Sequence, residues 1–522
     1  MPAWLKDAIF YEIYPQSFFD SNGDGIGDVP GITQNLDYIR NLGCNALWLN
    51  PVYDSPFLDA GYDVRDHKKV APRYGTNEDL FHLFNEAHAR EMRVLLDLVP
   101  GHTSLDHPWF IEASSQEPNL LSGRYIFTNS VWDAPAGYRW VSGTLERDAN
   151  FLVNFFSTQP ALNYGFYEIN EPHWQNPPDH PGCTSTLEAL IDVMRYWLDN
   201  GADGFRVDMA DSLVKNDDDK IATSRLWRTI REMLDNDYPE AALVSEWSHP
   251  ERSVNMAGFH MDFYLDHWYN GYHSLVRRRE NEINRCYVGK GAPGDITLFT
   301  SDFVPKYNMI KDNGYIAFIT CNHDTPRLSR YLDESEIKLA YALVFTMPGV
   351  PFLYYGDEIG MKYIEGLKSK EAGYDRTGSR TPMQWGPGKN LGFSSADPAE
   401  LYLPVDGAAD APTVKRQLDD PGSLLNTVKA LISLRRNNKD LNADGDFEVI
   451  HAKKDDPLFI YRRGSLHLYI NPGSEELPVD LSSSISTSQV PLSSIIYTIG
   501  NARIENKRLT LPPQSFAVLG RK

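Results

Sequence analysis

The segment DGFRVD (203–208) is a short apolar run that ends in a carboxylate, and its pattern decides the fold. Seven further runs have a similar length and β-rich composition: AIFYEIYP (8–15), NALWLNP (45–51), RVLLDLVP (93–100), AALVSEW (241–247), MDFYLD (261–266), IAFITCNHD (316–324) and VPFLYYGDE (350–358). Strands that alternate with helix-period segments are typical of a parallel sheet with crossover helices. Eight such units predict an α/β fold, a (β/α)8 TIM barrel, with its active site at the C-terminal strand ends.

The segments between these runs have helical periodicity. Residues 77–91 place four apolar side chains on one face, namely Leu80, Phe81, Phe84 and Ala87. Residues 187–200 repeat the pattern and are followed by Gly201, a helix stop signal. We therefore expect an amphipathic helix in each segment.

Two stretches break the alternation of strands and helices. Residues 103–180 are rich in Pro, Gly, Asn and aromatic residues and are too long for a structureless loop, which predicts an inserted irregular domain after the third strand. Residues 441–522 contain alternating runs such as PLFIYRRG and SLHLYINPG, which predict a C-terminal antiparallel β-sandwich. The barrel itself then comprises residues 1–102 and 181–440.

Charge and composition exclude several classes of partner. The formal charge of −21 argues against nucleic acid and anionic membranes, because both require basic patches. The N-terminal residues lack the pattern of a secretion signal, and no run approaches the length of a membrane span. The four cysteines have no paired or metal-type spacing. We expect a cytoplasmic monomer or small homo-oligomer without a nucleic-acid or membrane partner.

Three of the predicted strands end near a carboxylate: Asp208, Glu246 and Asp324. Two carboxylates held a few ångströms apart can cleave a glycosidic bond, one as nucleophile and one as proton donor. Arg206 and Asp208 alternate on one strand, so both side chains point to the same face and the cation favours an ionised nucleophile. The proton donor requires the opposite shift: its pKa should be raised, by a drier environment or by neighbouring negative charge.

These residues lie in motifs that resemble the α-amylase family of glycoside hydrolases, and its α-glucosidase/oligo-1,6-glucosidase branch in particular. The matching segments, in the family's order, are DLVPGHTS (97–104), QPALN (159–163), GFRVDMA (204–210), LVSEWSHP (243–250), NHDTPR (322–327), YGDEIGM (355–361) and SRTPMQW (379–385). The resemblance covers about residues 8 to 385, and the last strands are similar to the family's C-terminal domain.

The resemblance implies a role for individual residues. It makes Asp208 the nucleophile, Glu246 the acid/base and Asp324 the stabiliser of the transition state. The residues that it implies for sugar binding are His102, Arg206 and His323 around the ring, Tyr62 as its platform, and Asp59 with Arg380 as the pair that closes the nonreducing end. A closed pocket implies exo-acting release of single glucose units by a two-step, retaining reaction.

Four positions depart from the family pattern. Gly101 stands where Asn usually precedes the signature His, so a hydrogen bond is lost or replaced, and Ser245 and Ala161 replace the usual Gly and Asp. Met209 follows the nucleophile, where the family has residues that correlate with linkage preference. The thioether would either fill part of the neighbouring sugar site or be a passive packing residue. These differences leave the linkage unassigned.

The loop DSNGDGIGD (20–28) is the candidate metal site. Asp20, Asn22, Asp24, the carbonyl of Ile26 and Asp28 supply oxygen atoms, which suit Ca²⁺ or Mg²⁺. The same loop binds a metal in many family members, which implies a structural ion. The alternative is a polar turn rich in Asp and Gly.

The leading hypothesis is a retaining, exo-acting α-glucosidase that acts on short oligosaccharides or small α-glucosides. One alternative is a transglycosylase or isomerase of the sucrose isomerase or trehalose synthase type, in which a sugar replaces water in the second step. A further alternative, made unfavourable by the intact acids, is an inactive carbohydrate-binding relative.

Overall fold

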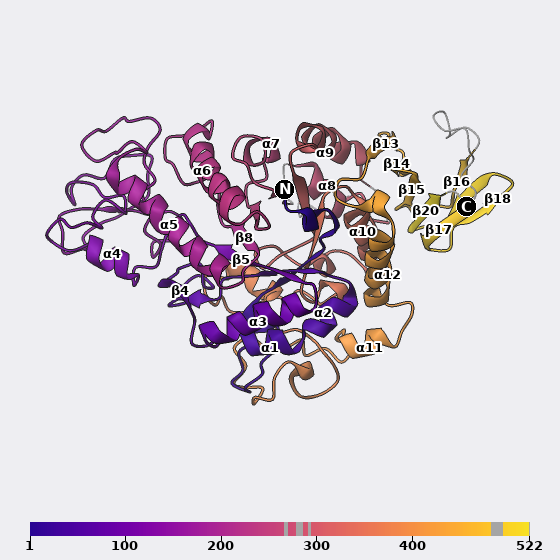
Figure 1. Ribbon diagram of the computed structural model, residues 1–522. Coiled ribbons are helices and arrows are strands. Elements are labelled where there is room, and N and C mark those ends of the chain that lie inside the picture. Colours follow the sequence, from indigo (N-terminus) through magenta and orange to yellow (C-terminus); the bar gives the residue numbers. More distant parts are fainter. Residues whose placement is uncertain (266–269, 278–285, 291–293, 482–493, 521–522) are drawn as a thin grey trace.

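The computed structural model describes residues 1–265, 270–277, 286–290, 294–481 and 494–520. Its centre is a closed barrel of parallel strands in the order β1-β12-β11-β10-β9-β8-β5-β2 (Figure 1). The strands are β1 (Phe10–Ile13), β2 (Ala46–Leu49), β5 (Arg93–Leu98), β8 (Gly204–Val207), β9 (Ala242–Ser245), β10 (Met261–Phe263), β11 (Tyr315–Ile319) and β12 (Val350–Tyr354). Each lies within or within one residue of a predicted run, which confirms the TIM barrel; Asp266, the end of the sixth run, lies outside the described residues.

The strands are apolar along their length because both of their faces are covered. Every residue of β1, β2, β8, β9 and β12 is buried, as expected for a parallel sheet under helices. The main covering helices are α1 (Val29–Gln34), α2 (Leu36–Leu42), α3 (Asn77–Ala89), α5 (Pro181–Asp199), α6 (Ile221–Asp237), α9 (Ile296–Ile310), α10 (Glu334–Thr346) and α12 (Leu424–Asn437).

Helix α3 forms where its periodicity predicts it. Thr76 and Asp79 form a capping box at its N-terminus. Its buried face includes Leu80, Phe84 and Ala87 as predicted, but Leu83 is fully buried where Phe81 was expected. Phe81 is only partly buried and packs against the edge of the core, since it lies at the boundary of the apolar stripe.

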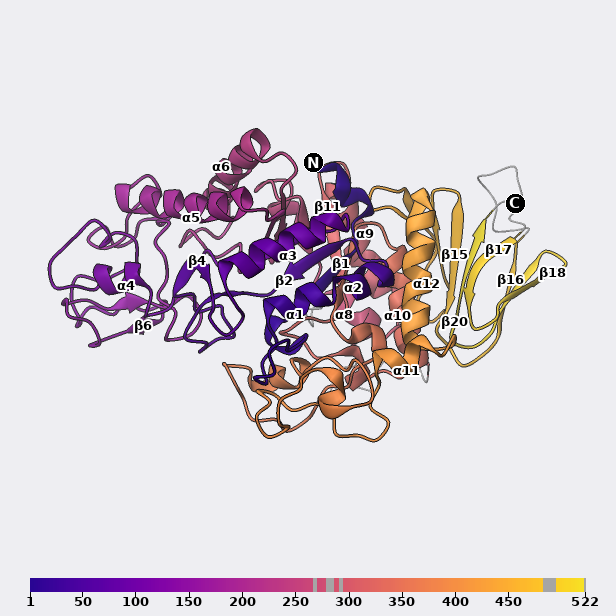
Figure 2. The same ribbon diagram turned by 60° about the horizontal axis from the view of Figure 1, so that its bottom comes forward.

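Two additions flank the barrel at opposite ends of the molecule (Figures 1 and 2). After β5 the chain forms α4 (Pro108–Ala113) and a small sheet of β6 (Trp140–Val141) and β7 (Phe151–Leu152), with irregular segments around them. At the other end, two antiparallel sheets have the strand orders β13-β14-β15-β20-β17 and β16-β19-β18. Residues from both sheets, including Tyr469, Val479 and Leu509, form one apolar cluster, as in a β-sandwich. The residue boundaries of the three domains stay predictions.

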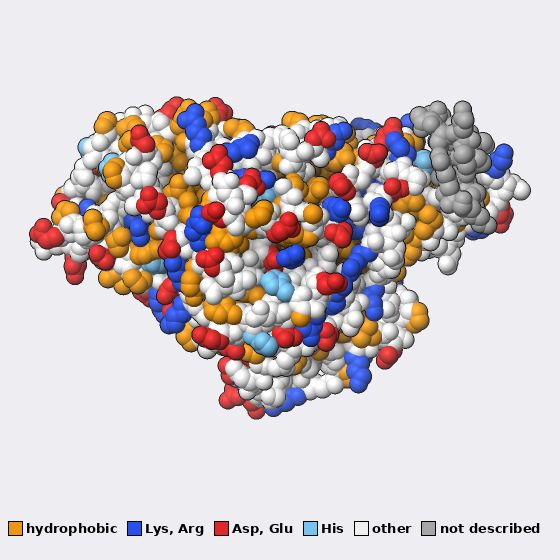
Figure 3. All heavy atoms as spheres, viewed as in Figure 1, with side chains coloured by type: hydrophobic (Ala, Val, Ile, Leu, Met, Phe, Trp, Pro, Cys, Tyr) orange, Lys and Arg blue, Asp and Glu red, His pale blue; other side chains and the backbone are white. Residues whose placement is uncertain are grey.

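The C-terminal strands follow one another closely along the chain. Their bounds are β13 (Phe447–His451), β14 (Phe459–Arg463), β15 (Leu466–Asn471), β16 (Leu477–Asp480), β17 (Ser494–Ile499), β18 (Arg503–Glu505), β19 (Arg508–Leu511) and β20 (Ser515–Gly520). On the face seen in Figure 3, acidic and basic side chains are interspersed. Within the described ranges, no helix combines the length and the apolar character that crossing a membrane requires.

Candidate active site

The C-terminal ends of the strands surround a cavity of about 270 Å³. Its lining includes all three predicted acids, Asp208, Glu246 and Asp324. Asp208 and Glu246 directly follow β8 and β9, and their N–H groups extend the sheet bonding by donating to Leu98 O (2.9 Å) and Val207 O (3.0 Å). The parallel register therefore places these two carboxylates side by side at one rim.

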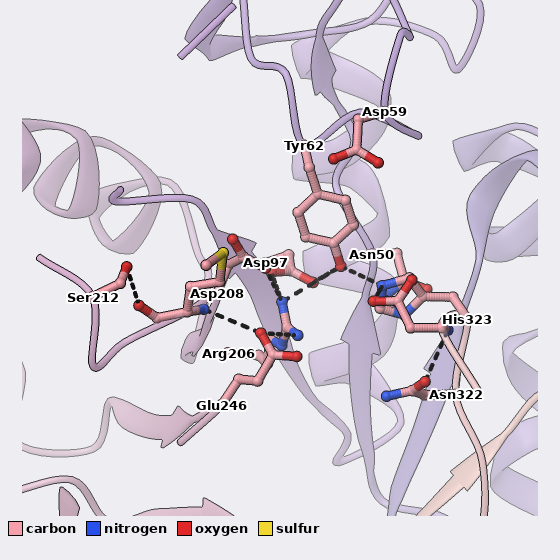
Figure 4. Close-up of polar contacts among 12 residues, drawn as sticks. Asn50, Asp59, Tyr62, Asp97, Arg206, Asp208, Ser212, Glu246, Asn322 and His323 are labelled. Carbon is pink, nitrogen blue, oxygen red and sulfur yellow. Dashed lines mark hydrogen bonds and ion pairs between the residues drawn. The ribbon is translucent and has the colours of Figure 1, made fainter. Parts of the chain in front are cut away.

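Arg206 connects the carboxylates at the bottom of this cavity (Figure 4). One guanidinium nitrogen lies 2.8 Å from Asp97 Oδ1 and 3.1 Å from Asp208 Oδ1, and the other lies 2.8 Å from Glu246 Oε2. The register pairs Asp97 with Arg206 across β5 and β8, which fixes the first contact. Asp208 and Glu246 are thus held within the width of one guanidinium group, and both face the same cavity.

The direction of the Asp208 pKa shift differs from the simplest expectation. Burial raises the pKa of Asp208 well above its ordinary value, Glu246 raises it further, and Arg206 opposes the shift. Arg206 favours the ionised carboxylate as predicted, but its charge is shared with Asp97 and Glu246 and is outweighed. Two carboxylates that compete for a proton can supply one ionised and one protonated group.

Asp324 is the acid with the strongest cationic surroundings. Its Oδ1 lies 2.6 Å from Arg376 Nη1 and 2.8 Å from Arg380 Nη2, and its Oδ2 lies 3.2 Å from His323 Nε2. Burial acts in the opposite direction, but His323, Arg376 and Arg380 hold the pKa of Asp324 well below its usual range. An ionised Asp324 therefore faces the cavity, where it would favour positive charge on a bound ligand.

Asp59 pairs with a different arginine from the one predicted. Gln159 Nε2 donates to Asp59 Oδ2 at 2.7 Å, and Arg376 Nη2 lies 3.7 Å from Asp59 Oδ1. Arg380 instead donates to His323 O and Asp324, so the chain turn before Arg380 brings Arg376 to the cavity rim. Burial raises the pKa of Asp59 to about 6. Arg376 is therefore the arginine beside Asp59 at the cavity, whereas Arg380 lies deeper, against His323 O and Asp324.

Tyr62 lies in the loop between β3 (Tyr53–Asp54) and β4 (Asp66–Val70) and lines the cavity as predicted. Its hydroxyl donates to Asp97 Oδ2 at 2.9 Å and lies 2.7 Å from His323 Nε2. The Tyr62 and His323 rings stack with centroids 5.4 Å apart. Tyr62 is therefore fixed at the bottom of the cavity. His323 and Arg206 were predicted to contact the sugar, but they do not line the cavity and instead contact side chains that do.

His102 obtains its hydrogen-bond partner from the inserted segment. Burial lowers the pKa of His102 to about 3, so the ring is neutral. Its Nε2–H donates to Tyr62 O at 3.1 Å, and the side-chain amide of Asn154 donates to its Nδ1 at 3.1 Å. A Cβ at Gly101 would lie 2.7 Å from that same Asn154 nitrogen. The hydrogen bond that Gly101 cannot make is replaced, and the absent side chain leaves space for Asn154.

Met209 contributes both its backbone and its side chain. Its φ of 43° places it in the left-handed region, which is unusual for a residue other than glycine. In that conformation its N–H donates to Glu246 Oε2 at 3.1 Å. The thioether lines the cavity near Phe155 and Trp247. Met209 is therefore part of the site and not a passive packing residue.

Several lining residues escaped the motif analysis. They are Phe155, Asp211, Trp247, Leu265 and Arg376. Trp247 and Asp211 are close in sequence to a predicted acid, and Leu265 lies near the end of the sixth predicted run. Those positions were the available signals. Ser245 donates to Asp262 Oδ1 at 2.6 Å, and Ala161 is fully buried, so neither departure adds a polar group to the cavity.

The predicted metal loop is organised by its own hydrogen bonds. Asp20 accepts from the N–H groups of Gly23 (2.7 Å) and Gly25 (2.8 Å), and Asp28 accepts from Ser21 N (3.0 Å) and Gly31 N (2.6 Å). In the described parts of the chain, no group of three or more His, Cys, Asp or Glu side chains is arranged to hold a metal ion. In this conformation the side-chain oxygens of Asp20, Asn22, Asp24 and Asp28 accept from backbone N–H groups, so these side chains and the Ile26 carbonyl do not form a preformed ion site.

Comparison with known proteins agrees with this geometry. The model of the α-amylase catalytic domain matches residues 12–444. The chain belongs to the α-amylase family. The motif resemblance is thereby confirmed.

The relatives of this α-amylase family member have different named activities. The trehalose synthase/amylase TreS of Mycolicibacterium smegmatis is 33% identical over 490 residues, which cover 86% of this chain and 78% of the relative. The probable oligo-1,6-glucosidase 2 of Bacillus subtilis is 31% identical over 526 residues, 88% of each chain. The crystal structure of isomaltulose synthase from Erwinia rhapontici NX5 is similar with a TM-score of 0.79 and 25% identity, over 100% of this chain and 99% of that one.

Proposed function

We propose that this family member is a retaining, exo-acting α-glucosidase that removes terminal α-linked glucose from short oligosaccharides or small α-glucosides. The proposal is carried by one observation: Asp208 and Glu246 share Arg206 and face one cavity with Asp324. The named oligo-1,6-glucosidase relative supports hydrolysis. The different named activities of its relatives leave the linkage open.

The proposed reaction has two steps. Asp208 attacks the anomeric carbon while Glu246 donates a proton to the leaving oxygen, so the glycosidic bond breaks as the glycosyl-enzyme bond forms. Glu246, now a carboxylate, then takes a proton from water, and that water displaces Asp208 and releases α-glucose. Asp324, ionised between two arginines, favours the positive charge that develops on the sugar ring.

Transfer in place of hydrolysis is the second candidate function. The named trehalose synthase and isomaltulose synthase similarities favour it, since both make a disaccharide. Phe155, Met209 and Trp247 would form the surface that retains a sugar acceptor beside the glycosyl-enzyme. The acids act identically in both candidates, so the acceptor alone distinguishes them.

The test is product analysis with maltose, isomaltose, sucrose and trehalose. We expect glucose released as the α-anomer, and we expect Asp208→Asn to lower kcat by about 10⁴-fold or more. Glu246→Gln should reduce turnover most for poor leaving groups, because those need the proton. Asp192→Asn, at an exposed carboxylate, is the matched control.

Two other outcomes of these experiments would each reject the proposed hydrolysis. If isomeric disaccharides are the main product, the enzyme transfers glucose to a sugar acceptor, and the proposal of hydrolysis is rejected. Absence of turnover on every substrate, with Asp208→Asn indistinguishable from the wild type, would identify an inactive carbohydrate-binding relative.

A further inference from the structure

A buried carboxylate that the proposed reaction does not use lies behind the active site. Glu12, on β1, is fully buried, and its Oε1 lies 2.9 Å from Nδ1 of the equally buried His323. Neither residue lines the cavity; His323 reaches it through Asp324 and Tyr62. A buried charge requires a partner, and His323 is the side chain placed to be that partner.

The hydrogen bonds around His323 define where its protons are. The hydroxyl of Tyr62 has a single proton, and Asp97 Oδ2 receives it at 2.9 Å. The Tyr62 oxygen, 2.7 Å from His323 Nε2, is therefore an acceptor, as is Asp324 Oδ2 at 3.2 Å. A lone pair on Nε2 would face an ionised carboxylate, so Nε2 carries a proton.

The other ring nitrogen faces Glu12 in the same way. Nδ1 lies 2.9 Å from Glu12 Oε1, and the Asn50 side-chain nitrogen lies 3.2 Å from that same oxygen and 3.1 Å from Nδ1. The amide nitrogen can only donate, and Nδ1 is nearer to Glu12 Oε1 than to Asn50. A carboxylate oxygen accepts both N–H groups, whereas a neutral Nδ1 would place its lone pair against Glu12. Both ring nitrogens therefore donate to carboxylates, the arrangement that an imidazolium requires.

We propose that Glu12 is a positioning residue that keeps His323 doubly protonated and so places a fixed positive charge behind Asp324. The effect on catalysis rests on the proposed function, but the charge state of His323 does not. With this charge in place Asp324 stays ionised and keeps one orientation toward the sugar.

The surrounding groups decide over which pH range the charge persists. Those that act on this pair are Asp97 from β5, Arg206 from β8, Asp324 after β11, Tyr354 from β12 and Arg380, whose Nε donates to His323 O. Burial lowers the pKa of His323, but Asp324 and then Glu12 raise it to about 9. Burial raises the pKa of Glu12, and its bonds to His323 and Asn50 lower it.

The first experiment compares pH profiles of kcat/KM for the wild type and Glu12→Gln with an aryl α-glucoside. Because the cation is present below its raised pKa and lost above it, wild-type activity should fall only as pH rises through about 9. In Glu12→Gln the amide no longer balances the charge, so we expect the alkaline limb to move to lower pH by about one unit or more. An unmoved limb in a folded variant would overturn the proposal.

Glu358→Gln is the matched control. Glu358 is also fully buried beside the barrel, and it accepts from Tyr11 and Tyr38 at 2.8 and 2.6 Å, away from the cavity. The same loss of a buried carboxylate should leave the alkaline limb in place. If the alkaline limb of the kcat/KM profile moves equally in both variants, the effect of Glu12→Gln comes from the loss of any buried carboxylate. That result would contradict the proposal.

The second experiment needs no substrate and no variant that must fold. In wild-type protein with ¹³C-labelled histidines, His323 should retain imidazolium chemical shifts at pH 7.5 and titrate near 9. A neutral His323 at pH 7.5 would overturn the proposal even if the protein is an α-glucosidase. An imidazolium in a protein that hydrolyses no glucoside would instead reject the proposed function alone.

Discussion

At the residue scale, Asn154 completes a motif from a different part of the chain. Its amide donates to His102 Nδ1, and its Oδ1 accepts from the half-buried Lys215 at 3.1 Å. Burial lowers the pKa of Lys215 to about 8, so the lysine needs this partner. One amide thus orients the neutral histidine and accepts a hydrogen bond from Lys215, which also donates to Ser212 O.

We expect Asn154→Ala to lower kcat/KM by about tenfold, because a buried hydrogen bond of this kind is worth about 1–3 kcal/mol. Steady-state kinetics with an aryl α-glucoside measure the change. Asn129→Ala is the control, since Asn129 lies in the same inserted segment and donates to His173 O on the surface. Wild-type kcat/KM in Asn154→Ala would show that His102 needs no partner on Nδ1.

At the scale of elements, the loop 20–28 has two interpretations that a measurement can separate. Its carboxylates accept from backbone N–H groups, as in a turn rich in Asp and Gly. The metal interpretation requires those oxygens to turn toward an ion. Asp24 is the exposed carboxylate of the loop, and its Oδ1 accepts from Ile26 N at 2.9 Å.

If the loop binds Ca²⁺, excess chelator should lower Tm by a few degrees and change kcat at 25 °C little. An ion held at a hundred times its Kd stabilises the native state by about 2.7 kcal/mol. Differential scanning fluorimetry with and without chelator and added Ca²⁺ measures this. Asp24→Asn should remove the response, and an unchanged wild-type Tm would reject the metal site.

At the scale of the whole molecule, the C-terminal sandwich is attached to the barrel through α10. Tyr461 on β14 and Thr346 at the end of α10 have their hydroxyls 2.6 Å apart, and Arg463 donates to the backbone carbonyl of Thr346. Phe459, Tyr461 and Phe516 belong to the same apolar core as the helices around the barrel. The two parts are therefore expected to unfold together.

We expect Tyr461→Phe to lower the free energy of unfolding by about 1 kcal/mol, because it removes a hydroxyl bonded between the two parts. Denaturant unfolding followed by circular dichroism measures it. Tyr167→Phe is the control, since Tyr167 is 43% exposed. Equal stability of Tyr461→Phe and the wild type would indicate that this contact contributes nothing to the attachment.

The barrel and the acids were predictable from the sequence for a local reason. A buried parallel strand is mostly apolar along its length, and the residue that follows it reaches the open end of the barrel. The segments DGFRVD and AALVSEW therefore indicate both the strand and the carboxylate near its end. The assignment of individual C-terminal strands to the two sheets had no such signal, because alternation does not say which strand pairs with which.

By itself the sequence determined eight strands, their order along the chain, and the three acids at their ends. The tertiary structure decided which partners surround those acids: Arg376 beside Asp59, Asn154 beside His102, and Glu12 beside His323. The last pair is separated by 311 positions. The contact between Glu12 and His323 depends on barrel closure and strand register, and the other two depend on how segments outside the barrel strands fold back over it. No local pattern encodes these, since each strand is specified by its own burial and not by its neighbour.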